Sequence, residues 1–478
     1  MAASSATAAS VLGSYDLVCQ IAQFQHGLPE PYVRVAKELH AFIKTRWLDR
    51  NGVHGYHLKH LSSFQSWLEP FWHVYGANGL LRLVAYSPGL FISEVVDHMA
   101  CLGLASAVRL LYSRRKRGTL WGFAYAARFG HLDVVQFLHE QGEASTTDAL
   151  YWACEHGHMD VVEFLHKHRT DGCTSRAMDR AAANGHLSIV KFLHHERTEG
   201  ATTAAMDSAA VNGHLDIVAF LHTNRSEGAT KAAMDGAAAN GFLDIVLYLH
   251  AQRREGCTSS AMTAAATNGH SDVVTFLDAH RTEGCHDTGA MDGAAANGHL
   301  KIVEFLHSRG KRCTAAAMHG AAIGGHLDVV KFLHTHRTEG CQRNTLDSVA
   351  AAGQLHVLQW FHSHRPREVC TQAALHSAAA NGHLDTVVFL HERRSESCNE
   401  DSMAGAATAG ALDVVKYIHS EICRLWASVG MYHAAAHGQT DVARYLKTHS
   451  RAVAWSRAIQ LAHDKADSKA VALLSSLN

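Results

Sequence analysis

The chain has 478 residues, of which 47% are hydrophobic and 18% are charged, and its formal net charge is −1 at pH 7. The hydrophobic content is sufficient for a packed interior, and a nearly neutral chain has no electrostatic attraction to nucleic acid or to an anionic membrane. No apolar run reaches the ~18 residues of a transmembrane helix, and the Ala/Ser-rich start lacks the basic segment of a secretory signal. We therefore expect neither nucleic acid nor a membrane as a partner.

Residues 1–98 differ from the rest, because they hold four of the five prolines and three of the eight tryptophans. The pattern predicts an amphipathic helix over 33–47 and a decayed copy of the later repeat over 77–84, anchored on Gly79. We expect a helical N-terminal cap with atypical repeats, since terminal repeats usually diverge. An independent N-terminal domain is the alternative.

Residues 99–449 repeat one motif, seen in Ala181-Ala-Ala-Asn-Gly-His-Leu-Ser-Ile-Val-Lys-Phe-Leu-His194. Each copy has an anchor glycine, and successive anchors are 27 to 29 residues apart. The anchors are Gly130, Gly157, Gly185, Gly213, Gly241, Gly269, Gly298, Gly325, Gly353, Gly382, Gly410 and Gly438. Self-similarity at a fixed short period is typical of a solenoid, here of about twelve to fourteen repeats.

Each copy predicts two short helices. In the copy that begins at Cys173, we expect Thr174 to be the N-cap of a first helix over 175–184, with an apolar stripe of alanine and methionine. Gly185 should end that helix with a positive φ, and a second helix should start near Leu187. Paired alanines let helices approach closely, and large pairs such as Phe305-Leu306 should fill the space between layers.

Residues 450–478 contain a last faint copy. Ala466 lies 28 residues after Gly438, and the segment 470–474 matches a second helix. Charged residues around Ala466 replace the usual small ones. We expect this copy to be a C-terminal cap.

The repeat resembles the ankyrin repeat, on the match of Ala321-Ala-Ile-Gly-Gly-His-Leu-Asp-Val-Val-Lys-Phe-Leu333. The family's period is ~33 residues, so about five residues are missing where the family carries its projecting β-hairpin. The family's Thr-Pro-Leu-His opening is altered, and only Leu375-His376 keeps its second half. The resemblance implies an all-α, ankyrin-type solenoid of paired short antiparallel helices with helical caps and with β-hairpins shortened or absent.

Seven of the eleven cysteines share one position of the repeat, which alanine fills in other copies. They are Cys173, Cys257, Cys285, Cys313, Cys341, Cys370 and Cys398. A position that accepts either residue fills a small apolar space, and neighbouring copies about 8–10 Å apart are too distant for a disulfide. Free thiols favour a cytoplasmic location, with the nucleus as the alternative.

Two histidine sets repeat among the 39 histidines. The first follows the anchor glycine and is expected to stabilise the turn between helices by a hydrogen bond: His131, His158, His186, His214, His270, His299, His326 and His383. The second ends the Phe-Leu-His triplet, near the negative end of the second helix dipole: His139, His166, His194, His222, His307, His334, His362 and His391. Members one repeat apart cannot reach one zinc ion, so we expect no metal site.

Aspartates recur six residues before the anchor, which we name the ladder position, and variable residues occur five before it, the face position. The aspartates pair either with backbone and with the repeated loop arginines, or they form an acidic stripe for a basic partner. By resemblance, the face position looks into the concave groove. The tentative partner-binding residues are Asp179, Arg180, Asp207, Ser208, Asp235, Asp292, Asp347, Ser348 and Ser377.

No catalytic motif is present, and we expect no cofactor. The resemblance implies a protein–protein interaction scaffold or adaptor, a monomer that binds an unidentified protein along its concave face. A second hypothesis is a substrate-recruiting subunit of a ubiquitin-ligase-type complex, docked through residues 1–98, where Leu28-Pro29-Glu30 resembles an F-box start. An enzyme in the N-terminal region is a third and weaker one.

Overall fold

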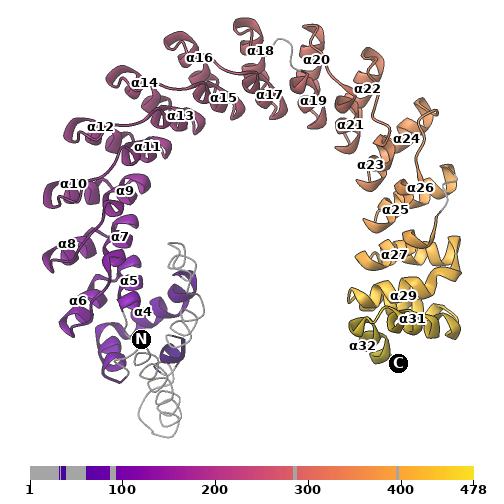
Figure 1. Ribbon diagram of the computed structural model, residues 1–478, viewed down its shortest axis with the longest axis horizontal. Helices are drawn as coiled ribbons and strands as arrows, with labels where there is room; N and C mark the ends of the chain where they lie inside the picture. The colour runs from indigo at the N-terminus through magenta and orange to yellow at the C-terminus, as the bar shows by residue number, and fades with distance from the viewer. Residues whose placement is uncertain are drawn as a thin grey trace. The chain divides into compact units, whose positions relative to one another are not determined.

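The computed structural model describes residues 32, 34–38, 61–86, 93–283, 288–394 and 398–477. Over these ranges the chain is helical and contains no strand, which confirms the all-α fold. The chain divides into two compact units, Met1–Ala229 and Thr230–Asn478. Within each unit, the first helices of the repeats pack side by side in one row, and the second helices form another row (Figure 1).

From α5 to α32 the described chain forms fourteen helix pairs. In the first unit they follow α4 (Leu61–Tyr86) and are α5 (Ser93–Cys101) with α6 (Ala105–Ser113), α7 (Leu120–Arg128) with α8 (Leu132–Glu140), α9 (Thr147–His156) with α10 (Met159–His168), α11 (Arg176–Ala183) with α12 (Leu187–Glu196), and α13 (Thr203–Val211) with α14 (Leu215–Asn224).

The second unit holds the other nine pairs. They are α15 (Lys231–Ala239) with α16 (Leu243–Gln252), α17 (Ser259–Thr267) with α18 (Ser271–His280), α19 (Gly289–Ala296) with α20 (Leu300–Ser308), α21 (Ala315–Ile323) with α22 (Leu327–His336), α23 (Thr345–Ala351) with α24 (Leu355–His364), α25 (Gln372–Ala380) with α26 (Leu384–Arg394), α27 (Glu400–Ala409) with α28 (Leu412–Tyr417), α29 (Ala427–Ala436) with α30 (Thr440–His449), and α31 (Ala452–Asp464) with α32 (Ser468–Ser476).

The interior repeats almost residue for residue. In each regular first helix, two alanines, a methionine and a third small residue are buried, as in α15 with Ala233, Met234, Ala237 and Ala238. The second helix buries a β-branched pair and a leucine, as in α16 with Ile245, Val246 and Leu249. Helices of nine or ten residues are marginal alone in water, so this burial between neighbours holds them.

The anchor glycines end the first helices as predicted. Gly185 has φ 82° directly after α11, and Gly241 has φ 78° after α15. Gly79 is different, because it lies within α4, where it was expected to anchor a decayed repeat. The break in α4 is at Gly76, with φ 51° and ψ −148°. Gly76 precedes Gly103 by 27 residues, so the break lies at the repeat spacing, and the assignment of the anchor to Gly79 was wrong.

In the second helices, the two members of each large pair, such as Phe305-Leu306, differ in burial. Leu306 and Leu333 are buried between layers as predicted, whereas Phe305 and Phe332 are only half-buried. Phe332 presents its ring to the edge of His307 in the preceding repeat, with centroids 5.5 Å apart. The prediction that phenylalanine fills the inter-layer space was therefore wrong.

The C-terminal segment forms the helix pair α31 and α32. Ala466 takes the anchor position with φ 52°, which is unusual for a residue with a Cβ. Asp467 caps α32 by accepting from the backbone amides of Lys469 and Ala470. Of the N-terminal expectations, most of the 33–47 helix and Leu28–Glu30 lie outside the described residues, as does Cys285; residues 34–38 are helical.

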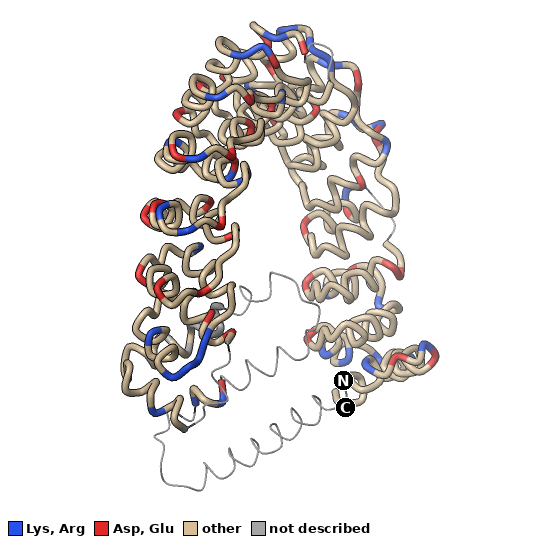
Figure 2. Tube along the Cα trace, turned by 60° about the vertical axis from the view of Figure 1, so that its left-hand side comes forward, with Lys and Arg blue, Asp and Glu red and all other residues tan. Residues whose placement is uncertain are grey.

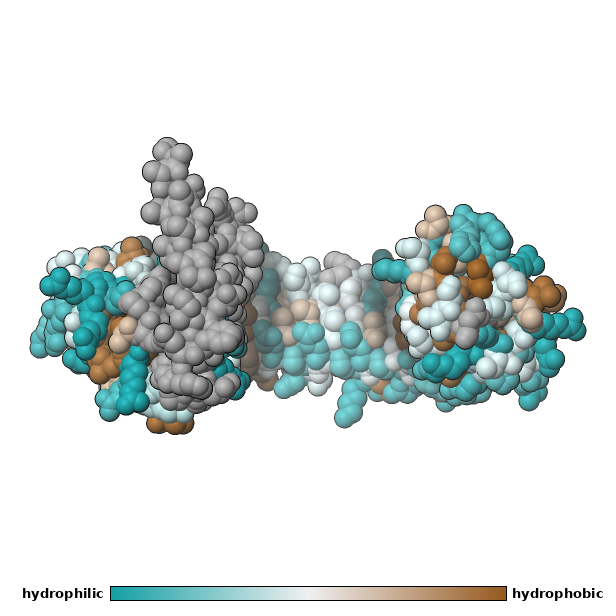
Figure 3. All heavy atoms as spheres, turned by 90° about the horizontal axis from the view of Figure 1, so that it is seen from below, coloured by the Kyte–Doolittle hydropathy of each residue, from teal (hydrophilic) through white to brown (hydrophobic). Residues whose placement is uncertain are grey.

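The surface mixes both signs of charge along the chain (Figure 2). Hydrophobic atoms form separate patches among hydrophilic ones on the face seen in Figure 3. The exposed large hydrophobic residues are Val74, Leu120, Leu247, Val369, Leu425 and Val453. None of the described helices is both long and apolar enough to cross a bilayer.

Candidate protein interaction surface

The ladder aspartates join successive repeats through a threonine of the next repeat, which lies eleven residues before its anchor. Thr202 donates its amide and its hydroxyl to the two carboxylate oxygens of Asp179, both at 2.8 Å. The same hydroxyl accepts from the amide of Ala204 at 3.1 Å and so caps α13. We name this arrangement the Asp–Thr clamp.

The clamp recurs in both units. It includes Asp97 with Thr119, Asp179 with Thr202, Asp235 with Thr258, Asp292 with Thr314, and Asp347 with Thr371. The structure thus places four predicted partner-binding aspartates, half-buried, at junctions between repeats, and Asp207 is half-buried at the same position. A partner that uses these carboxylates must approach groups that already accept two hydrogen bonds.

Asp97 is a clamp member that the sequence analysis missed, although it lies six residues before Gly103 as the others lie before their anchors. It is 0% exposed. Burial raises its pKa to about 7, against the opposing effect of the hydrogen bonds from Thr119.

The first helix of the Cys173 copy lacks the clamp, because Tyr151 occupies the preceding ladder position. Thr174, predicted to be the N-cap, does not cap: α11 begins at Arg176, and its N-cap residue Ser175 makes no side-chain bond. Arg176 instead places its guanidinium 5.1 Å from the Tyr151 ring centroid. A ladder aspartate is not essential for capping, because Thr146 caps α9 although Ala124 occupies the preceding ladder position.

The face positions lie where neighbouring first helices touch. Each face residue lies against the residue that is two positions before the anchor of the preceding repeat. A Cβ added to Gly320 would come within 2.6 Å of the Ala296 Cβ, and one on Gly405 within 3.0 Å of the Ala380 Cβ. The glycines at this position are therefore required by packing. Ser208, Ser348 and Ser377 are half-buried here.

Large side chains meet at the same junctions in the first unit. Arg180 lies 3.8 Å from Glu155, and the Arg180 side chain is 52% exposed. Trp152 stacks on Tyr125, with centroids 5.6 Å apart and an interplanar angle of 5°. Trp121 lies 6.1 Å from Trp152.

Two guanidiniums lie on these rings. Arg128 is 5.4 Å from the Trp152 centroid, and Arg176 is over Tyr151. We name Trp121, Tyr125, Arg128, Tyr151, Trp152 and Arg176 the aromatic–arginine patch. The sequence analysis missed it, although aligning the copies on their anchors shows tryptophan and arginine where later copies have glycine, alanine and serine.

The histidines after the anchors were expected to bond within their own turn. Those with a hydrogen bond bridge to the preceding repeat instead. The Nε2 of His158 lies 2.9 Å from the carbonyl oxygen of Arg128, and that of His299 lies 3.0 Å from the carbonyl of Thr267. Each ring also covers the anchor glycine of the preceding repeat, as His299 covers Gly269. The anchor must be glycine for its φ and for this close approach.

The second histidine set packs against the aromatic residue of the next second helix. Ring centroids are 5.3 Å apart for His166 and Phe192, and 5.2 Å for His334 and Trp360, in edge-to-face geometry. The Nδ1 atoms of His139, His166 and His307 are buried without a hydrogen-bond partner in the described chain. Over the same residues, no three His, Cys, Asp or Glu side chains are placed to hold a metal ion.

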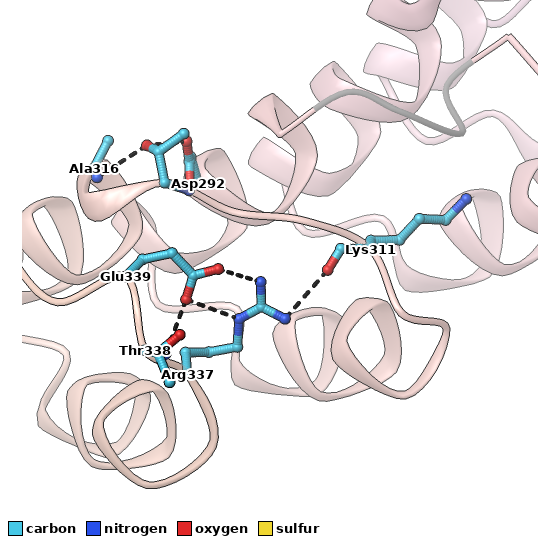
Figure 4. A network of polar contacts seen from close by, with 7 residues as sticks. Asp292, Lys311, Ala316, Arg337, Thr338 and Glu339 are labelled. Atoms are coloured by element: carbon cyan, nitrogen blue, oxygen red, sulfur yellow. Dashed lines mark hydrogen bonds and ion pairs between the residues drawn. The ribbon is translucent and has the colours of Figure 1, made fainter.

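The loop arginines pair with the acidic residue two positions later, not with the ladder aspartates. Arg337 bonds Glu339 and donates to the carbonyl of Lys311 in the preceding repeat at 3.4 Å (Figure 4). The hydrogen bond from Arg197 lowers the pKa of Glu199 to about 2. These exposed pairs shape the loops that replace the β-hairpins.

The repeated cysteines lie beside these loops. Cys257, Cys313 and Cys370 are buried free thiols, and Cys173, Cys341 and Cys398 are half-buried free thiols. Burial raises the pKa of Cys313 to about 11, so its thiolate is scarce at neutral pH. The packing interpretation fits this placement.

A polar hollow of about 480 Å³ opens on α25, α27 and α29, lined by Gln372, His376, Asn399, Asp401, Thr408 and His433 among others. Burial lowers the pKa of His433, so the imidazole is neutral at pH 7. The Nδ1 atom of His376 is buried and has no partner among the described residues. The hollow offers polar contacts on the same face as the predicted site.

Comparisons with known families agree with this geometry. A family model described as ankyrin repeats in three copies matches residues 123–203 and 234–317, and one described as ankyrin repeats in many copies matches residues 313–362. The chain is an ankyrin repeat protein. Ankyrin repeats generally mediate protein–protein interaction, and the family is typically non-catalytic.

Solved structures add little to the ankyrin assignment. The pentatricopeptide repeat protein PPR10, in complex with an 18-nt psaJ RNA element, is 12% identical with a TM-score of 0.40, over 94% of this chain and 78% of that chain. PPR10 from maize is 11% identical with a TM-score of 0.33, over 92% and 77%. Similarity this low carries no argument about RNA. No curated protein matches this ankyrin chain in sequence.

Proposed function

We propose that this ankyrin repeat protein is a non-catalytic scaffold or adaptor that binds a protein partner along the exposed face of its first helices. One observation carries the proposal: the buried positions repeat nearly unchanged, whereas the face position varies from Trp152 and Arg180 to Ser208 and Gly320. A constant interior with a variable exposed face is what a recognition scaffold requires.

The predicted contact residues are part of this proposal. Arg180, Ser208, Ser348 and Ser377 are the proposed contacts that take no part in the Asp–Thr clamp. The acidic stripe of Asp179, Asp207, Asp235, Asp292 and Asp347 stays a prediction, in which a basic partner would share carboxylates with the threonines. A monomeric state and a cytoplasmic or nuclear location also stay predictions, as does the ubiquitin-ligase role of residues 1–98.

Proximity labelling with the full chain in its native cell tests the scaffold. Ser208→Arg with Ser348→Arg adds bulk and charge to the face, at a position where Arg180 shows that arginine is accommodated. Thr223→Arg with Thr335→Arg is the matched control, because both residues are exposed on second helices. We expect labelled partners to disappear with the first pair only. Equal partner lists for wild type and both variants would refute binding by the first-helix face.

A further inference from the structure

The aromatic–arginine patch is not explained by the stacking of repeats. From α13 to α21, the positions nine and five residues before the anchor hold only Ala204, Ser208, Ala232, Gly236, Ser260, Ala264, Gly289, Gly293, Ala316 and Gly320. Repeats built from these small residues stack in the same way. In α7, α9 and α11 the same positions hold Trp121, Tyr125, Asp148, Trp152, Arg176 and Arg180. Since packing does not require these large side chains, a different constraint must explain them.

The rings of the patch form a preorganised platform. Tyr125 is buried and supports Trp152, which stacks on it, while Trp121 and Trp152 are themselves half-exposed. Arg128 and Arg176 lie on the ring faces of Trp152 and Tyr151. Stacking restricts each guanidinium, so less conformational freedom is lost when it binds an anion.

The cations of the patch are available. Neither Arg128 nor Arg176 has a carboxylate within ion-pair distance in the described part of the chain, whereas the loop arginines such as Arg197 are paired. Arg180 approaches Glu155 only at 3.8 Å and is half-exposed. Tryptophan, tyrosine and arginine are also the residues most enriched among interface hot spots.

We propose that the aromatic–arginine patch binds an acidic segment of the partner protein. Carboxylates of that segment pair with Arg128 and Arg176, and an aromatic or aliphatic side chain packs on Trp121 and Trp152. This assignment rests on the proposed scaffold function and names the chemistry of its partner. Glu155 and Asp148 lie on α9 between the arginines, so the patch suits a segment with a few spaced carboxylates better than a continuous phosphate backbone.

The test uses the purified full chain and a random twelve-residue peptide library displayed on phage. The variant Arg128→Gln with Arg176→Gln removes both charges and keeps a polar, hydrogen-bonding side chain at each position. The control Arg254→Gln with Arg343→Gln removes two exposed arginines elsewhere. We expect peptides that bind wild type and control, but not the patch variant, to be enriched in Asp and Glu beside an aromatic or aliphatic residue.

One selected peptide is then measured by fluorescence anisotropy. We expect at least a tenfold weaker Kd for the patch variant, an unchanged Kd for the control, and weakening with added NaCl. Arg128→Ala with Trp152→Ser, which copies the Ala183 and Ser208 found two junctions later, should lose binding while circular dichroism shows unchanged helix content.

Three results would overturn the assignment: selected peptides without acidic enrichment, no peptide that distinguishes the patch variant, or a twelve-nucleotide single-stranded RNA that binds wild type and loses binding in the patch variant. The proposed function fails separately. If partners are lost with Ser208→Arg and Ser348→Arg but retained with the patch variant, only the proposal for the patch is refuted. If partners are retained with both variants, the proposal that the first-helix face binds them is refuted as well.

Discussion

The Asp–Thr clamp makes a quantitative prediction at two threonines that look equivalent in sequence. Thr202 and Thr174 both lie eleven residues before an anchor glycine. Thr202 donates to Asp179 and caps α13, whereas the Thr174 hydroxyl has no partner within the described chain. Thr202→Ala should therefore destabilise the protein, and Thr174→Ala should not.

The expected difference follows from the bonds removed. Loss of an N-cap costs about 1 kcal/mol, and loss of a hydrogen bond to a charged group costs about 1.5–3 kcal/mol. Because the Thr202 amide still bonds Asp179, we expect about 2 kcal/mol for Thr202→Ala. Thr174→Ala is an exposed substitution and should stay within about 0.5 kcal/mol.

Hydrogen exchange at single amides is the appropriate assay, because long repeat arrays need not unfold in one step. The amide of Ala204, which the Thr202 hydroxyl accepts from, should exchange faster in Thr202→Ala. Urea unfolding should lose about 2 kcal/mol in the same variant. Equal losses for the two threonine variants, or none for Thr202→Ala, would show that the clamp is not a stabilising contact.

Three other substitutions test the packing and the buried charge. Ala237→Leu should cost about 1–3 kcal/mol by overpacking, whereas exposed Ala232→Leu on the same helix should be nearly neutral in thermal unfolding. Gly269→Ala should lower the free energy of unfolding by about 2–3 kcal/mol, because φ is 87° and the new Cβ would lie 2.7 Å from the next histidine ring. Gly310→Ala, with φ 68° and no neighbour within 4 Å, should lower it by about 1 kcal/mol. Equal losses would reject the histidine contact. The raised pKa of Asp97 means that its contribution to stability falls as pH rises through about 7, by at most about 1.4 kcal/mol per pH unit. Urea unfolding from pH 5 to 8 should therefore show that the stability of wild type relative to Asp97→Asn decreases with pH. A constant difference between the two proteins would contradict the raised pKa.

The fold was predictable because its information is local and repeated. Spacing located the helix pairs, and the apolar stripes identified the buried residues, as in Met178, Ala181 and Ala182. The anchor assignment failed at Gly79 because two glycines lie three residues apart there and only the backbone shows which one breaks the helix. Repeat spacing alone could not choose between them.

The candidate site was less predictable, because its contacts run between repeats. Asp179 and Thr202 are 23 residues apart, and only stacking brings them together. Their pairing changes the physical meaning of the aspartate ladder, since each carboxylate already accepts two bonds at a junction. The aromatic–arginine patch was missed for the same physical reason, since Trp152 stacks on Tyr125 and meets Arg128 only when neighbouring repeats pack together.

The limits of the patch follow from the same junction geometry. A face residue lies against the residue two before the preceding anchor, and at two junctions both members are large: Arg128 with Trp152, and Glu155 with Arg180. The next pair, Ala183 and Ser208, is small, and the later pairs Thr267–Gly293 and Ala296–Gly320 leave no room for a Cβ. At Gly293 and Gly320 a larger residue cannot be introduced without a change in its neighbour, because the close approach of the helices leaves no room for it. The first unit differs, because α7, α9 and α11 provide two successive junctions in which both members are large.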